Sequence, residues 1–320
     1  MPTSARNTVQ AERVPASSRS TPERILQRLD WQVIRPLDGI LQGDYRSLFY
    51  GYGLDLADLR EYQPGDDIRY IDWNVTARMD TPYVRQYMED REVTAWFLLD
   101  LSPSMDFGTV QSGTAPGEKR TMLIDLVGTL ARLLTRHGNR VGAILYDNRV
   151  ERVIPASGGR LHVLRLVNDL LRQPRLTAAP LTDLNVLIET GFRMIRRRSL
   201  VFIISDFISA PGWEKPLALL NRKHEVLAVR LWDPSENELP DVGLVLMQDA
   251  ETGEQAWVDT HESRFRRRFT EIVQRRQANL DAAFRSAGVD VLALSTEDDL
   301  VRAIVRFAAQ RKQHKQIAGR

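Results

Sequence analysis

The sequence contains no cysteine among its 320 residues. Disulfides, thiolate nucleophiles and cysteine metal ligands are therefore excluded, and the composition fits a reducing compartment. No window reaches the ~18 consecutive apolar residues of a membrane span, and the first residues lack the apolar core of a signal peptide. We therefore expect a cytoplasmic protein without a membrane span.

The sequence is also poor in the motifs that carry common enzyme chemistry. Only five histidines are present, and His261–Glu262 begins an H-E-x-x-H pattern whose second histidine is missing. There is neither a G-x-x-x-x-G-K-[ST] phosphate loop nor a G-x-S-x-G elbow. A nucleophile with an adjacent base is therefore hard to assemble from these residues.

Charge of one sign is not concentrated either, because the formal net charge is only +2. This slight excess is not the strong positive field of a dedicated nucleic-acid binder. The one basic helix, RFRRRFTEIVQRRQ at residues 264–277, has Phe265, Phe269, Ile272 and Val273 at helical spacing. Core packing of these apolar residues explains the pattern more simply than nucleic-acid binding does.

Changes in residue composition and in the apolar pattern divide the chain into four parts. Residues 1–23 are rich in Ser, Thr, Arg and Pro, which predicts a disordered tail. Residues 24–92 begin with a helical or irregular stretch and continue with glycines, aromatics and alternating apolar residues, typical of a β-rich extension. Residues 93–310 alternate strand and helix patterns, and residues 311–320 are predicted to be a basic flexible tail.

The pattern of residues 93–310 predicts an α/β domain. Apolar runs such as AWFLLD and VFIIS suit strands that are covered on both faces, and the helical patterns between them imply crossovers above a mostly parallel sheet. The fold class is thus a doubly wound α/β sheet with an N-terminal β-rich extension. The expected strands are residues 94–99, 140–146, 150–154, 200–204, 225–231 and 289–294, and the expected helices are residues 119–136, 160–172, 183–196, 214–221, 262–286 and 297–310.

Oxygen-bearing side chains follow two of the expected strands. Asp100, Ser102 and Ser104 come after one strand, and Asp206 comes after another. Ligands of open parallel sheets bind beyond the carboxyl ends of the strands, where Thr182, from a loop, could join these residues. Two carboxylates and three hydroxyls suit a hard divalent cation such as Mg²⁺ (or Mn²⁺). Each part also has a structural explanation: Pro103 and the serines could form an ordinary turn, and Thr182 or Asp206 could cap a helix.

The set DLSPS, Thr182 and Asp206 resembles the metal-ion-dependent adhesion site of von Willebrand factor A domains, whose pattern is Asp-x-Ser-x-Ser with a distant Thr and a distant Asp. The stretches LREYQPGDDIRYIDWNVTAR, ISDF and WDPSENELPDVGLVLMQDAETGE, with DLSPSM, resemble the bacterial family called domain of unknown function 58 over about residues 40–310. The resemblance implies a Rossmann-type α/β fold and an adaptor or scaffold rather than an enzyme. It further implies a metal with one position open for an acidic residue of a partner, and association with MoxR-type AAA+ ATPases.

Two other functions and one open segment complete these expectations. A metal-dependent phosphoester hydrolase would use Asp100 as nucleophile and Asp206 as metal ligand, but Ser102 stands where such enzymes have a second acid. A nucleic-acid binder would use the basic helix and the C-terminal tail. The turn Gly65–Asp67 is typical of solvated acids, and the role of the segment from there to Arg78 stays open.

Overall fold

A computed structural model describes residues 21–37, 58–64, 66–68, 71–79, 81–86, 93–108, 118–175, 182–248 and 255–318 of the chain. Residues 1–20 of the predicted tail lie outside these described residues. The structure is mixed α/β, with a mostly parallel six-stranded sheet flanked by helices. The α/β class is thereby confirmed.

The central sheet has the order β10-β7-β6-β3-β4-β5. All neighbours in it pair in parallel except β4 and β5, which are antiparallel and joined by a tight turn in which the Asp147 amide donates to the Arg149 carbonyl. The strands are apolar because the sheet is covered on both faces. They comprise β3 (Thr94–Asp100), β4 (Arg140–Tyr146), β5 (Val150–Ser157), β6 (Leu200–Ser205), β7 (Glu225–Trp232) and β10 (Asp290–Ser295).

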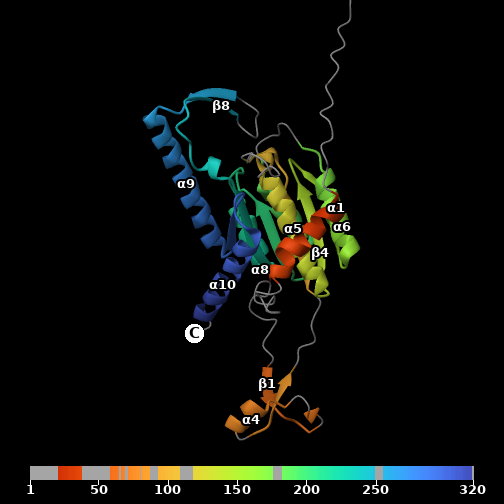
Figure 1. Ribbon diagram of the computed structural model, residues 1–320. Helices are drawn as coiled ribbons and strands as arrows, with labels where there is room; N and C mark the ends of the chain where they lie inside the picture. Colours follow the sequence, from red (N-terminus) through yellow and green to blue (C-terminus); the bar gives the residue numbers. More distant parts are fainter. Residues whose placement is uncertain are drawn as a thin grey trace, which may run out of the picture.

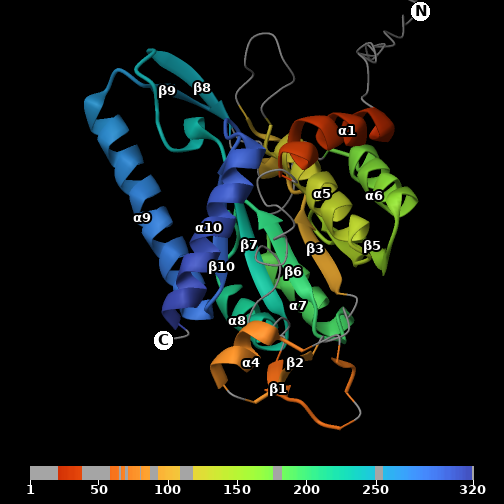
Figure 2. The same cartoon turned by 60° about the horizontal axis from the view of Figure 1, so that its bottom comes forward.

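Helices cover both faces of this sheet and enclose two apolar cores (Figures 1 and 2). The first core is closed by α1 (Pro22–Leu29), α5 (Lys119–Arg136), α6 (Arg160–Arg172) and α10 (Leu300–Ala318). The second is closed by α7 (Leu184–Met194), α8 (Glu214–Lys223) and the C-terminal half of α9 (Ser263–Ala287). Strands and helices were therefore well predicted by the apolar runs and their spacing.

Two predicted boundaries differ from the structure. Helix α1 begins at Pro22, inside the predicted tail of residues 1–23. Together with the π-helical η1 (Asp30–Ile34) it packs on the first core through Leu26, Leu29 and Ile34, in agreement with the helical or irregular start expected for the extension. Their apolar spacing follows a helix and not a strand. Helix α10 also continues to Ala318, past the predicted boundary at residue 310, and Arg311 is buried there. The division of the chain into domains otherwise stays a prediction.

Two small sheets complete the fold. Strands β1 (Asp58–Glu61) and β2 (Tyr83–Gln86) pair antiparallel, with α4 (Trp73–Met79) between them, and this unit lies apart from the α/β body (Figure 1). Strands β8 (Leu244–Gln248) and β9 (Gln255–Asp259) form an antiparallel pair that is not among the strands expected from the sequence. The first pair agrees with the strands expected in the extension.

Candidate functional site

The candidate site lies at the carboxyl edge of the central sheet, where the chain order reverses. From β3 the sheet continues through β4 and β5 on one side and through β6, β7 and β10 on the other. Strands β3 and β6 are hydrogen-bonded neighbours, with Leu99 opposite Ile204. The loops that follow β3 and β6 therefore start side by side, and these are the loops that carry the predicted aspartates.

The loop after β3 turns its polar groups inward. The Leu101 amide donates to the Tyr146 carbonyl (2.7 Å), and the Ser102 amide donates to Asp100 Oδ1 (3.0 Å). A short 3₁₀ helix, η3 (Pro103–Asp106), begins after Ser102, and the hydroxyls of Ser102 and Ser104 lie 3.1 Å apart. Asp100, Ser102 and Ser104 thus form one buried polar group.

The loop after β6 is fixed against the same group. Ser205 donates its hydroxyl to Asp100 Oδ2 (2.6 Å) and accepts from the Phe207 amide (2.8 Å). Phe207 has φ 58°, a left-handed conformation that costs a bulky residue energy and is found preferentially at functional sites. Its ring packs edge-on to Phe284, 4.8 Å between centroids, and this contact keeps the turn in place. Asp206 lies between Ser205 and Phe207, and its Oδ1 accepts from the Ile208 amide (2.9 Å).

Thr182 reaches the same edge from the loop before α7. Its carbonyl accepts from the Ala210 amide (2.8 Å) and from the Ser209 hydroxyl (3.0 Å), which joins it to the loop of Asp206. Helix α7 is capped by Asp183, so capping does not explain the threonine. The structure therefore brings all five predicted residues to one edge, each with 4% or less of its surface exposed. Whether they bind a metal stays a prediction.

Two further residues belong to this group and were not predicted. The Lys119 ammonium, on the first residue of α5, lies 2.6 Å from Asp206 Oδ2 and 2.5 Å from Glu236 Oε1. Burial lowers the pKa of Lys119, but the charges of Asp206 and Glu236 outweigh it and the net shift is upward. The ammonium is therefore charged. The sequence signal, a lysine at the start of a helix where the dipole disfavours it, is too common to be read alone.

Glu236 comes from the end of a third strand. It belongs to η4 (Pro234–Glu236), where Asp233 accepts from the Ser235 amide and Glu236 accepts from the Asp233 amide, a capping box. Asp233 is itself buried and accepts from the Thr296 hydroxyl after β10 (2.7 Å). A continuous polar layer thus runs along the carboxyl ends of β3, β6, β7 and β10.

The acids of this layer affect one another. Burial, and then the nearby charge of Asp206, raise the pKa of Asp100 from 3.8 to about 7. Lys119 pairs with Asp206 and Glu236, and the charge of Arg230 also interacts with these two acids. Close buried carboxylates that repel each other, beside two hydroxyls, fit a small hard cation.

The donor set is rich in hydroxyls and poor in the usual acidic ligands. Within the described parts of the chain there is no group of three or more His, Cys, Asp or Glu arranged to hold a metal. An ion here would have to rely on Ser102, Ser104 and Thr182 as much as on the aspartates. Mg²⁺ tolerates such a shell because it keeps several waters and binds few carboxylates.

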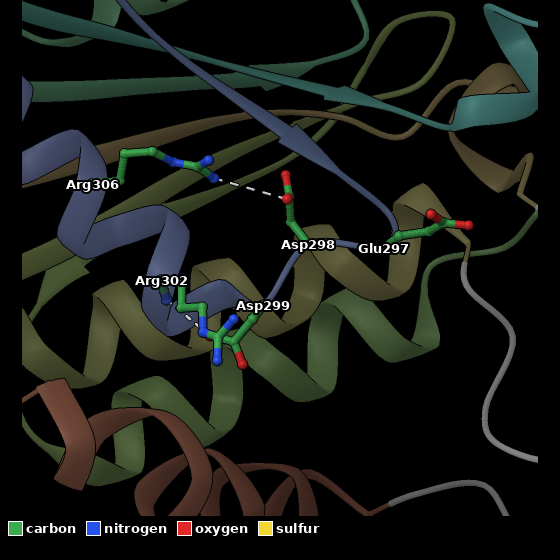
Figure 3. Close-up of a pocket in the computed structure, with 5 residues that line it drawn as sticks. All are labelled: Glu297, Asp298, Asp299, Arg302 and Arg306. Atoms are coloured by element: carbon green, nitrogen blue, oxygen red, sulfur yellow. Dashed lines mark hydrogen bonds and ion pairs between the residues drawn. The ribbon is translucent and has the colours of Figure 1, made fainter.

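A separate hollow opens at the start of α10 (Figure 3). Its lining includes Asp298, which pairs with Arg306 at 3.9 Å, and Asp299, which accepts from the Arg302 amide at 2.8 Å. These are solvated helix-start contacts. The hollow contains none of the predicted site residues.

The other expected segments have structural roles in what is described. Asp66 closes a turn by accepting from the Gln63 amide (2.8 Å), and Gly65 lies outside the described residues. In the basic helix α9, the expected core packing is only partly correct, because Ile272 is 60% exposed and the buried residues are Leu280, Phe284 and Ala287. The sheet covers only the C-terminal half of this long helix.

Comparison with known proteins shows the family of this chain. The family model "Protein of unknown function DUF58" matches residues 58–279. The chain belongs to this family. Uncharacterized protein Mb1516 of Mycobacterium bovis and uncharacterized protein Rv1480 of Mycobacterium tuberculosis are each 38% identical to it over 288 residues, which is 90% of this chain and 89% of theirs. The shorter uncharacterized protein MAV169 of Mycobacterium avium is 36% identical over 52% of this chain and 98% of its own.

Solved structures resemble this DUF58 protein only in outline. BatB from Bacteroides thetaiotaomicron has a TM-score of 0.41 at 12% identity, covering 69% of this chain and 99% of its own. An aerotolerance-related membrane protein from Bacteroides fragilis has a TM-score of 0.44 at 13% identity, with the same coverage. Among the described helices of the present protein, none combines the length and apolarity needed to cross a bilayer.

Proposed function

We propose that this DUF58 protein is a metal-dependent interaction module and not an enzyme. In this proposal Asp100, Ser102, Ser104, Thr182 and Asp206 hold Mg²⁺ or Mn²⁺, as in the adhesion site of von Willebrand factor A domains. The bound ion would supply an electrophilic centre for an acidic residue of a partner protein. A MoxR-type AAA+ ATPase is the proposed partner, and the cytoplasm is the proposed location.

The observation that carries the proposal is the convergence of two buried aspartates and two hydroxyls where the strand order reverses. If the six strands of the central sheet are numbered 1 to 6 in chain order, with β3 as strand 1, their order in space is 3-2-1-4-5-6. The direction of this order reverses between β3 and β6. In Rossmann-type sheets this point is the ligand site. Burial, and then the charge of Asp206, raise the pKa of Asp100, so these two acids lie close enough to affect each other. This order and this charge support a von Willebrand A-like domain with a cation site.

The residues of the chain divide the work in this proposal. The hydroxyls of Ser102 and Ser104 are neutral donors, so they would leave the ion more net positive charge than carboxylates would, which favours capture of a partner's acid. Ser205 and the Ser102 amide orient Asp100 by donating to its two oxygens. Because the five side chains are almost fully buried, a partner's carboxylate can reach the ion only when a loop at this edge moves aside.

The experiment is thermal unfolding with MgCl₂ or MnCl₂ and with chelator. A ligand that binds only the folded state at one hundred times its Kd stabilises it by about 2.7 kcal/mol, so Tm should rise by several degrees. Ser104→Ala and Asp206→Asn should lose most of this rise, because each removes an oxygen donor or a charge. Ser286→Ala, an exposed serine on α9, should keep it.

An equal rise of Tm in the wild type and in Ser104→Ala would refute the metal site. Binding of a purified MoxR-type ATPase from the same organism, measured with Mg²⁺ and with chelator, tests the partner separately. Loss of that binding in Asp100→Ala and in chelator is expected. Binding that is equal in chelator would contradict capture through a metal.

A further inference from the structure

The least expected group at the carboxyl edge is the ammonium of Lys119, which has no exposed surface. A lysine at the first position of a helix opposes the positive end of the dipole, and a buried ammonium is costly without partners. The two carboxylates that meet Lys119, at 2.6 Å on Asp206 and 2.5 Å on Glu236, compensate both effects. This is a built cation position inside the candidate site.

The ammonium uses an oxygen that a metal at this site would need. Asp206 Oδ2 accepts from Lys119 and Asp206 Oδ1 accepts from the Ile208 amide, so both oxygens are already engaged. A positive charge at hydrogen-bond distance from a ligand also repels a second cation, and this repulsion is strong where water is excluded. Lys119 and a divalent ion therefore compete for the charge of Asp206.

We propose that Lys119 is a tethered cation that sets the affinity of the Asp206 site for a divalent ion. This inference rests on the proposed function, since it assumes that the same five residues bind the ion. The ammonium neutralises part of the site while no metal is bound, and it keeps metal affinity lower than the hydroxyls and aspartates alone would give.

Glu236 is the second part of this device. Its other oxygen accepts from the Asp233 amide in the capping box, so the side chain is held in position beside Lys119. By sharing the ammonium, Glu236 weakens the hold of Lys119 on Asp206. When a metal binds Asp206, Lys119 can stay paired with the carboxylate of Glu236. Arg230, on β7, is the other cation whose charge acts on Asp206 and Glu236, and it stays in place in every variant below.

The test is calorimetric titration of MgCl₂ and MnCl₂ into the full chain at fixed pH and ionic strength. Lys119→Met keeps most of the length of the side chain but removes its charge, and it should tighten metal binding at least tenfold. Glu236→Gln removes one negative charge and leaves Asp206 as the only carboxylate partner of Lys119, so it should weaken binding severalfold. Lys215→Met, which removes an exposed lysine charge, should change the affinity less than twofold.

The outcomes separate this inference from the proposed function. Tighter binding by Lys119→Met with weaker binding by Glu236→Gln supports the inference. If the wild type binds metal but Lys119→Met binds it equally or more weakly, the tethered-cation role is overturned while the metal site remains.

If only Lys119→Met binds metal, the tethered cation is supported and the metal-dependent function of the wild type is overturned. If no variant binds, both are overturned. Should Lys119→Met fail to fold, Lys119→Gln takes its place. Tighter metal binding by Lys119→Gln and weaker binding by Glu236→Gln then support the inference, and equal or weaker binding by Lys119→Gln overturns it.

Discussion

Two clusters of ion pairs lie at opposite edges of the central sheet, the carboxyl and the amino ends of its strands, and they have the same arrangement of charges in different surroundings. At the carboxyl edge Lys119 lies between Asp206 and Glu236. At the amino edge Arg311, on α10, pairs with Asp290 at 2.8 Å and with Glu225 at 2.7 Å, the first residues of β10 and β7. Each cluster has one buried cation between two carboxylates.

The clusters differ in their access to water and in the number of buried acids beside them. The side chains of Asp290 and Glu225 are 44% and 20% exposed, whereas those of Asp206 and Glu236 are 1% and 13% exposed. Water can therefore compensate the acids at the amino edge. At the carboxyl edge Asp100 adds a further carboxylate that is wholly buried. The ion pairs at the amino edge thus attach α10 to the sheet, while the carboxyl edge holds its acids away from water.

Removing the central cation should produce the largest and most unequal effects. Without metal, Lys119→Met should destabilise the fold by about 3–5 kcal/mol, because breaking a buried pair leaves carboxylates without compensation. Arg311→Met should cost about 2 kcal/mol, since its acids are partly solvated and methionine keeps part of the packing near Phe307. Urea unfolding of both variants checks this.

Arg306→Met, which removes a largely exposed guanidinium from the same helix α10, is the control and should stay within about 0.5 kcal/mol. Equal losses in Lys119→Met and Arg311→Met would mean that the two edges do not differ in the way the exposed fractions indicate.

The amino edge should also respond to acid through His224, the residue before β7. Burial, and then the charge of Lys223, lower the pKa of His224 from 6.5 to about 4. Between these two values the unfolded chain binds the proton and the folded chain does not. Stability from this group is therefore present above pH 6.5 and is lost as the pH falls toward 4, by roughly 2 kcal/mol.

Unfolding of the wild type and of His224→Gln at several pH values measures this effect as the difference between the two proteins. That difference should shrink as the pH falls from 6.5 to 4. His261→Gln, which replaces a largely exposed histidine, is the control. A difference that is constant across this range would contradict the lowered pKa.

The smallest effect is expected at the acid of the amino edge that water reaches most. Asp290→Asn should cost less than about 1 kcal/mol, since exposed ion pairs contribute little and Glu225 still pairs with Arg311. Its salt dependence should also be small, which urea unfolding at low and high NaCl measures. A loss as large as that of Lys119→Met would show that Asp290 is not compensated by water.

Much of the fold could be predicted because local patterns and burial agree. The runs AWFLLD and VFIIS are long, apolar and bounded by polar residues, so β3 and β6 were found within one residue of their ends. In β8 and β9 the apolar residues do not correspond to burial, because Leu244, Leu246 and Trp257 are exposed. The β8–β9 pair was therefore not predicted. The helix of residues 311–318 was not predicted either, since its polar sequence does not show that Arg311 has two acids to meet.

The five-residue set could be predicted for a similar reason. Asp100, Ser102 and Ser104 are close in sequence, and Asp206 ends the next strong apolar run in the sheet. Lys119 and Glu236 could not be found in this way, because each comes from a different element and only the packing of α5 against the end of β7 brings their charges together. The left-handed turn at Phe207 was equally invisible, since its stability depends on the distant ring of Phe284.

The sequence by itself determined which segments become strands and helices, because the spacing of apolar residues encodes burial directly. It also determined which oxygen-bearing side chains end β3 and β6. Only the tertiary structure decided that β3 and β6 are neighbours and that a buried ammonium lies against Asp206. The physical reason is that strand order and charge balance depend on contacts between residues far apart in the chain, and no local pattern records them.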